Sequence, residues 1–192
     1  YQMLFETGLG VYAQPHIFWL SGFPGLLGPQ IVLRTLYTGA RVDHWFTPQT
    51  GGVQKMEMPT RIAKKLFLSL LSLEQKGVPR PKALPLQRAD IVARFVHNTL
   101  QRHGACYLRS YMSMAVRVCT ADYDLGLDLR VCTFLVSGEP VTPGKVACIR
   151  AAGGEVATTY STTETSYIGL GCLNAEDPSD LHLFTDAYAL IQ

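Results

Sequence analysis

The sequence predicts an α/β fold in which a mostly parallel β-sheet is flanked by helices. From Asp90 onward, short apolar or β-branched runs alternate with helical segments of about a dozen residues, which is typical of right-handed βαβ units. The composition agrees, because 47% of the 192 residues are hydrophobic and 17% are charged. A chain of this length can bury a core of its own, so we expect a single domain over residues 1–192.

The first part of the chain predicts one helix–strand unit. Residues 21–29 (SGFPGLLGP) are rich in Gly and Pro and predict a loop or the entry to a helix. Residues 31–45 (IVLRTLYTGARVDHW) predict a short helix that ends at Gly39 and is followed by a strand.

A longer helix and a break come next. Residues 58–77 predict a helix, because apolar residues recur at a spacing of three to four at Ile62, Leu66, Leu70 and Leu73. Residues 78–85 (VPRPKALP) predict a surface connection or a linker, with a domain sub-boundary near residues 78–86.

Helices and strands alternate in the rest of the chain. We expect a first helix that Asp90 caps and that ends at Gly104. Two more helices are expected, at residues 112–122 and from Thr142 or Pro143 to residue 154. We expect strands at residues 105–110, 131–138 and 155–160. The segments LHLF (181–184) and AYALI (187–191) are expected to close the fold as a strand pair.

The composition also excludes several classes of protein. The net charge is +2 and no run of Lys or Arg exceeds two residues, so nothing indicates nucleic-acid binding. No apolar run reaches the length of a membrane span. The five cysteines are widely spaced, without a CxxC pair or a secretory signal, which indicates reduced thiols in a cytoplasmic protein. The oligomeric state stays open, a homodimer included.

Two predicted strands end in polar sequence, and these ends form the candidate functional site. The strand at residues 131–138 runs into SGEP, and the strand at residues 155–160 runs into STTETS. Ligands of open parallel sheets bind beyond the carboxyl ends of the strands. If the two strands are neighbours, as consecutive βαβ strands usually are, both loops face one crevice.

The residue types in these loops suit a nucleoside triphosphate. Gly138 lets a flat ligand approach closely, and Glu139 with Pro140 sets a rigid turn. The carboxylate of Glu164 can hold Mg²⁺, and the ring of Tyr160 can stack on a base. Hydroxyl groups that can donate to phosphate oxygens come from Ser161, Thr162 and Thr163.

A purely structural interpretation of the same hydroxyl cluster stays open. Ser and Thr that follow a strand often form turns or cap a helix. Thr162 with Thr165, or Thr163 with Ser166, could start the next helix in this way.

In combination, these motifs resemble the adenylate-forming superfamily of acyl-CoA synthetases and ligases. Residues 137–164 (SGEPVTPGKVACIRAAGGEVATTYSTTE) match that family's order of strand, GGEPL-like loop, helix, Gly, strand and Y-G-x-T-E. The preceding LGLDLR is similar to a segment that the family has before the loop. The downstream GLGCLNAEDPSDLHLFTDAYALI looks like the phenylacetate-CoA ligase and coenzyme F390 synthetase branch, where a Cys and an H-x-x-x-D segment follow the acidic motif.

The resemblance implies a reaction and a role for each matching residue. Tyr160 would stack on adenine, Thr163 would hydrogen-bond the α-phosphate, and Glu164 would bind Mg²⁺. The adenine pocket would be lined by Gly138, Glu139 and Pro140, next to Ser161 and Thr162. The enzyme would use ATP to convert a small carboxylic acid to an acyl-adenylate, and coenzyme A would then take the acyl group.

The resemblance also implies that the chain is a segment of a longer enzyme. It begins at Tyr1 without a methionine and ends in YALIQ, which looks like an unfinished strand. The family's Lys-containing phosphate loop would precede Tyr1 and its mobile C-terminal domain would follow Gln192, so we expect this segment alone to be inactive. Ser161 stands where the family usually has Gly. A non-catalytic nucleotide-binding or scaffold domain of the same fold is therefore the alternative.

The resemblance suggests further candidate residues. Cys172 and His182 could hold a structural Zn²⁺, for which a buried thiol and a surface histidine are the alternative. Asp186 could contact the ribose or cap a strand. Residues 15–25 (PHIFWLSGFPG) resemble a helix start beside the family's acyl pocket. The residues expected in this pocket, with core or surface packing as their alternative, are His16, Trp19 and Tyr111.

Overall fold

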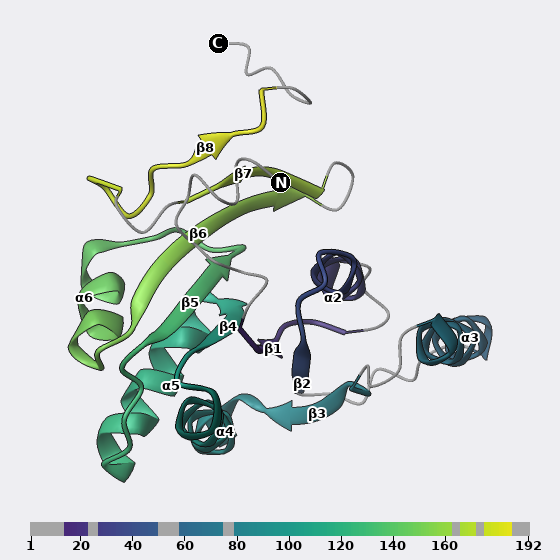
Figure 1. The fold of residues 1–192 in the computed structure, drawn as a ribbon, viewed down its shortest axis with the longest axis horizontal. Coiled ribbons are helices and arrows are strands. Elements are labelled where there is room, and N and C mark those ends of the chain that lie inside the picture. The colour runs from purple at the N-terminus through teal and green to yellow at the C-terminus, as the bar shows by residue number, and fades with distance from the viewer. Residues whose placement is uncertain are drawn as a thin grey trace.

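The computed structural model describes residues 14–22, 27–49, 58–74, 79–162, 166–171 and 175–185. Within these residues it confirms the α/β fold, with one eight-stranded sheet in the order β3-β2-β1-β4-β5-β6-β7-β8 (Figure 1). Neighbours from β3 to β6 pair in parallel, and the β6–β7 and β7–β8 pairs are antiparallel. The strands are β1 (His16–Trp19), β2 (Val42–Gln49), β3 (Lys82–Pro85), β4 (Cys106–Tyr111), β5 (Cys132–Ser137), β6 (Glu155–Thr162), β7 (Ser166–Leu170) and β8 (His182–Leu183).

The strand order reverses between β1 and β4. The chain adds β2 and β3 on one side of β1, and it adds β5 to β8 on the far side of β4. Trp19 pairs with Ser110, and Tyr111 pairs with Ser137, so the carboxyl ends of β1, β4 and β5 are level with one another. In open parallel sheets such a reversal is where ligands bind.

Helices cover both faces of the sheet (Figure 1). The described helices are α2 (Leu27–Tyr37), α3 (Met58–Glu74), α4 (Ala89–His103), α5 (Met112–Leu125) and α6 (Pro143–Ala151), with a 3₁₀ turn η1 (Leu86–Arg88). α4, α5 and α6 lie on one face, where alternate strand residues such as Leu108 and Phe134 are fully buried. α2 lies on the other face, against Phe18 and Trp45. This alternation of side chains between two buried faces is the period-two pattern of strands.

Glycine ends the helices where the sequence predicted it. Gly39 follows α2 and Gly104 follows α4, with φ values of 80° and 78°. A positive φ is unfavourable for residues with a Cβ, which explains the preference for Gly at these two caps.

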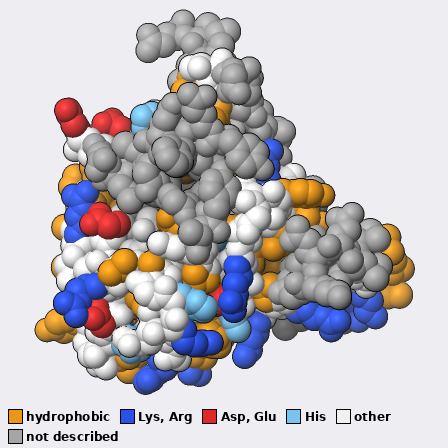
Figure 2. All heavy atoms as spheres, in the orientation of Figure 1, with side chains coloured by type: hydrophobic (Ala, Val, Ile, Leu, Met, Phe, Trp, Pro, Cys, Tyr) orange, Lys and Arg blue, Asp and Glu red, His pale blue; other side chains and the backbone are white. Residues whose placement is uncertain are grey.

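α3 forms as predicted but leaves apolar side chains exposed. Ile62 and Leu66, two of the residues whose spacing predicts the helix, are 60% and 61% exposed. Figure 1 shows α3 at the side of the molecule, where its half-buried Leu68 packs against the core next to α2. Figure 2 shows hydrophobic side chains at the surface there, beside Lys and Arg side chains. The spacing thus predicted the helix and not its burial.

Several local predictions were wrong. The break predicted at residues 78–85 contains strand β3, which pairs with β2. Its one proline, Pro85, is tolerated because β3 is at the edge of the sheet. Within residues 15–25, where a helix start was predicted, His16–Trp19 form strand β1, and residues 23–25 lie outside the described residues. Ser166 begins β7, so the hydroxyl cluster does not start a helix at that point. Residues 187–191, the predicted last strand, lie outside the described residues.

Asp90 is not the cap of α4. The helix begins at Ala89, one residue earlier, and its N-cap residue is Arg88. The Arg88 guanidinium donates to both carboxylate oxygens of Asp90 at 2.9 and 3.1 Å. These hydrogen bonds hold the pKa of Asp90 below its usual value, so Asp90 places a negative charge in the first turn of α4.

The described cysteines bear on the expectation of reduced thiols. Cys106, Cys119, Cys132 and Cys148 are free thiols, whereas Cys172 lies outside the described residues. Burial raises the pKa of Cys119 to about 12, which keeps this thiol protonated.

Across the described ranges, none of the helices combines the length and the apolarity needed to cross a membrane.

Candidate functional site

The reversal point of the sheet holds a hydrogen-bonded pair from β4 and the segment after β1. The Tyr111 hydroxyl donates to the Ser21 Oγ atom at 2.9 Å, across 90 residues of sequence. Tyr111 is the last residue of β4, and Ser21 comes two residues after β1 ends. The two side chains therefore connect the strands on either side of the reversal.

Gly138 lies directly against Tyr111. It follows the last residue of β5 and has a φ of 73°. A Cβ at this position would lie 2.9 Å from two carbons of the Tyr111 ring, closer than real contacts allow. Conformation and space both require glycine here, and the group that approaches it in the structure is the Tyr111 ring.

Glu139 holds the first turn of α5. Its Oε2 atom accepts the Ser113 backbone N–H at 2.7 Å, and its Oε1 atom accepts the Ser113 hydroxyl at 2.7 Å. Lys145 of α6 places its Nζ atom 3.8 Å from Oε2. A carboxylate at a helix N-terminus satisfies a free backbone donor and interacts favourably with the helix dipole. The side chain of Glu139 thus fastens the β5–α6 connection to α5, and Pro140 next to it is exposed.

The threonine-rich strand β6 divides into a buried and an exposed part. Val136 of β5 and Thr158 of β6 form the last pair between these strands, and Gly138 and Tyr160 each come two residues later in the chain. Tyr160 is 52% exposed. Thr159 is buried and donates its hydroxyl to the Val136 carbonyl at 3.4 Å. Tyr160 therefore offers its ring to solvent at the edge where Gly138 lies.

The end of β6 carries the rest of the predicted phosphate site. Ser161 and Thr162 are half-buried, and Thr162 pairs with Ser166 of β7. Thr163 and Glu164 lie outside the described residues, so their assignment to phosphate and Mg²⁺ stays a prediction.

The two other acyl-pocket candidates lie in the interior. His16 and Trp19 are completely buried in β1. His16 stacks on Tyr107 with ring centroids 4.8 Å apart, and Trp19 belongs to the core beneath the α4–α6 layer. Both positions are in the core packing that was the alternative to a pocket, whereas Tyr111 is at the reversal point.

The zinc and ribose predictions fall mostly outside what the structure describes. His182 is exposed in β8, where it pairs with Leu170, and Cys172 and Asp186 are not among the described residues. Within the described ranges no group of three or more His, Cys, Asp or Glu side chains could hold a metal ion. The zinc site and the role of Asp186 stay predictions.

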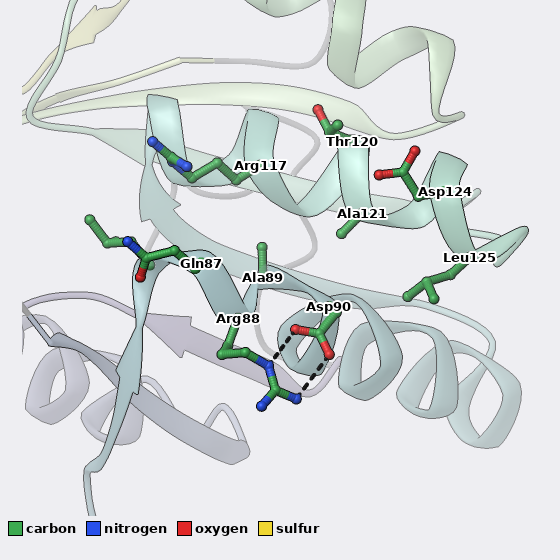
Figure 3. A pocket seen from close by; sticks show the side chains of 10 residues that line it. Gln87, Arg88, Ala89, Asp90, Arg117, Thr120, Ala121, Asp124 and Leu125 are labelled. Atoms are coloured by element: carbon green, nitrogen blue, oxygen red, sulfur yellow. Dashed lines mark hydrogen bonds and ion pairs between the residues drawn. The ribbon is translucent and has the colours of Figure 1, made fainter.

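A separate groove lies on the helical layer, between η1 with the start of α4 and the second half of α5 (Figure 3). Its volume is about 730 Å³. In Figure 3, Ala89 and Ala121 lie opposite each other. Arg88 points toward Asp90, and the two side chains form an ion pair. The groove contains none of the residues predicted for nucleotide binding. Its lining consists of Leu86, Gln87, Arg88, Ala89, Asp90, Arg117, Thr120, Ala121, Asp124 and Leu125.

Comparison with protein-family models and with curated proteins gives no match. Two solved structures are similar in part. A crystal structure of VinN has 15% sequence identity and a TM-score of 0.47, with 99% of this chain and 41% of that chain covered. A complex of VinN with L-aspartate has 17% identity and a TM-score of 0.44, with 92% of this chain and 36% of that chain covered. The chain thus spans well under half the length of these proteins, and at this similarity neither bears on its function.

The cap at Ser113 makes a testable prediction about stability. Glu139→Ala removes both hydrogen bonds to Ser113 and is expected to lower the free energy of unfolding by about 1–2 kcal/mol. Urea denaturation followed by circular dichroism measures this change. Glu155→Ala, at an exposed position at the start of β6, is the control and is expected to change it by less than about 0.5 kcal/mol. Equal effects of the two substitutions would show that the cap does not stabilise the fold.

Proposed function

We propose that the chain is part of an adenylate-forming ligase that uses ATP to activate a carboxylic acid and passes the acyl group to coenzyme A. The observation that carries the proposal is the parallel pairing of β5 with β6. This pairing brings the end of β5, which runs into SGEP, and the described end of β6, up to Thr162, to one edge of the sheet beside its reversal point. It is the arrangement on which the resemblance to this family depends.

The described residues support the nucleotide part of the proposal. Tyr160 is exposed two residues after the last β5–β6 pair, so its ring is available for stacking on adenine. Gly138 has a positive φ and no Cβ, so the Tyr111 ring packs against its backbone where the predicted adenine loop begins. Because the Glu139 carboxylate is engaged by Ser113, we assign Glu139 a positioning role, in which it fixes the loop that lines the adenine.

The residues at the end of β6 would contact the phosphates. Thr163 would donate its hydroxyl to the α-phosphate, and Ser161 and Thr162 lie next to it in the chain. A carboxylate beside hydroxyl oxygens is a donor set that suits Mg²⁺, so the group fits Glu164 in its chemistry. Bound there, Mg²⁺ would neutralise charge on the phosphate oxygens.

In the proposed reaction, a carboxylate oxygen of the substrate attacks the α-phosphorus of ATP. The bond from that phosphorus to the bridging oxygen breaks, and pyrophosphate leaves with the electron pair. The chain's contribution is to hold the nucleotide in line with the acid and to donate hydrogen bonds to the charge that develops at phosphorus. In a second step the thiol of coenzyme A displaces AMP from the acyl-adenylate.

Carboxylate-dependent ATP–pyrophosphate exchange tests the proposal. We expect the full-length protein to incorporate labelled pyrophosphate into ATP when a panel of carboxylic acids includes an accepted substrate, and not without acid. Addition of coenzyme A should then release AMP. Nucleotide binding without exchange for any acid would contradict the enzyme and support the non-catalytic alternative, which the Ser161 departure from the family motif favours.

A further inference from the structure

A second polar group lies on the face of the sheet that is opposite α4, α5 and α6. The Arg109 guanidinium of β4 donates to the Tyr167 hydroxyl at 2.8 Å and to the Nδ1 atom of His16 at 3.3 Å. It also lies over the Phe18 ring, 5.9 Å from the centroid. On α2, the Arg34 guanidinium is 5.6 Å from the centroid of the Tyr167 ring. One tyrosine therefore contacts two cations, one through its hydroxyl and one through its ring.

Among the described residues, the two arginines of this group, Arg109 and Arg34, have no carboxylate partner. The partners of Arg109 are neutral, since a His16 Nδ1 atom that accepts a hydrogen bond belongs to an uncharged imidazole. Placing a charge in a half-buried position is unfavourable unless a counter-charge or hydrogen bonds compensate for it. The two hydrogen bonds use only part of the N–H donors of Arg109.

The surroundings of Arg109 suit a carboxylate group. Phe18 and Tyr107 are buried beside it, and burial raises the pKa of Tyr107 to about 12, so this phenol stays neutral. Phe18 and Tyr107 have almost no exposed surface, so they pack beneath the Arg109 guanidinium and do not line the site. The guanidinium fork itself matches the two oxygens of a carboxylate. The group runs from buried His16 to exposed Arg34, so it reaches solvent at its α2 side.

We infer that Arg109, with Tyr167 and Arg34, binds a carboxylate group of a ligand. Arg109 precedes Tyr111 by two residues on β4, and such residues point to the same face about 6.6 Å apart. The anion site is therefore continuous with the reversal point at Tyr111. If the acid is activated there, its second acidic group reaches Arg109, and the substrate is a dicarboxylic acid. That substrate class rests on the proposed function, whereas anion binding at Arg109 does not.

Calorimetric titration of the full-length protein with succinate, in the absence of ATP, tests the anion site. We expect Arg109→Gln to weaken succinate binding at least about tenfold, because a charge-assisted contact is lost. Arg117→Gln removes an exposed arginine on α5 and is expected to leave the affinity unchanged. Equal affinity of the wild type and Arg109→Gln would overturn the inference.

A milder variant keeps the test informative if Arg109→Gln does not fold. Tyr167→Phe removes the hydroxyl that accepts from Arg109 and keeps the ring beside Arg34. We expect it to weaken succinate binding about threefold. Unchanged affinity in this variant, with native circular dichroism, would likewise contradict the site.

The exchange assay separates the anion site from the proposed function. With a dicarboxylic acid as substrate, Arg109→Gln should raise the KM for the acid at least about tenfold and leave the KM for ATP unchanged. Succinate binding that depends on Arg109, together with no exchange for any acid, would support the anion site and contradict the proposed function. Exchange with monocarboxylic acids alone, unaffected by Arg109→Gln, would support the function and overturn the anion site.

Discussion

Replacing Glu164 with alanine in the full-length protein is expected to lower acid-dependent ATP–pyrophosphate exchange at least about 100-fold. The reason is electrostatic. Glu164 is the carboxylate assigned to Mg²⁺, and loss of the metal's charge leaves the phosphate oxygens without compensation in the transition state. Glu164 belongs to the polar segment between β6 and β7, where no core residue is predicted, so the circular dichroism spectrum should stay native.

Two comparisons make this result specific. Glu176→Ala removes an exposed acid outside the proposed site and should leave exchange within about twofold of wild type. Glu164→Asp keeps a carboxylate on a shorter side chain, and it should restore part of the activity at raised Mg²⁺ concentration. Exchange that is unchanged in Glu164→Ala would contradict the assignment of Glu164 to the metal.

The sequence predicted the elements that have strong local signals. The helix before Gly104 and the strands that became β5 and β6 combine clear periodicity with a glycine or polar end, and the structure has them within a few residues. β1 (HIFW) and β3 (KALP) are short and lie next to proline. A run of four residues has no measurable periodicity, so only pairing with neighbouring strands decides its conformation.

The site was predictable only where one loop carries its own signal. SGEP contains a glycine that needs a positive φ, and that requirement is visible in the residue type. The long-range side-chain contacts around the site cannot be predicted in this way. Ser113 and Glu139 are 26 residues apart, Ser21 and Tyr111 are 90 apart, and Arg109 and Tyr167 are 58 apart. No pattern in a single sequence connects serines or an arginine with such distant partners, since their proximity is produced by the order of the strands.

Gly138→Ala tests whether the contact between β4 and β5 at the reversal point is needed for nucleotide binding. An alanine at a φ of 73° is strained, and its Cβ would meet the Tyr111 ring at 2.9 Å. We expect the free energy of unfolding to fall by about 2–4 kcal/mol and ATP binding to weaken. Gly39→Ala is the matched control, because Gly39 has a φ of 80° and nothing within 4 Å of the added carbon.

The two substitutions separate backbone strain from the clash with Tyr111. Gly39→Ala carries strain alone and should cost about 1–2 kcal/mol without any effect on ATP binding. Tyr111→Leu removes the ring, so adding Gly138→Ala to it should cost no more than Gly39→Ala does. If Gly138→Ala costs the same with and without the Tyr111 ring, the two residues are not coupled. In that case close packing of β4 against the SGEP loop is not what requires glycine, and the backbone conformation of the loop alone explains it.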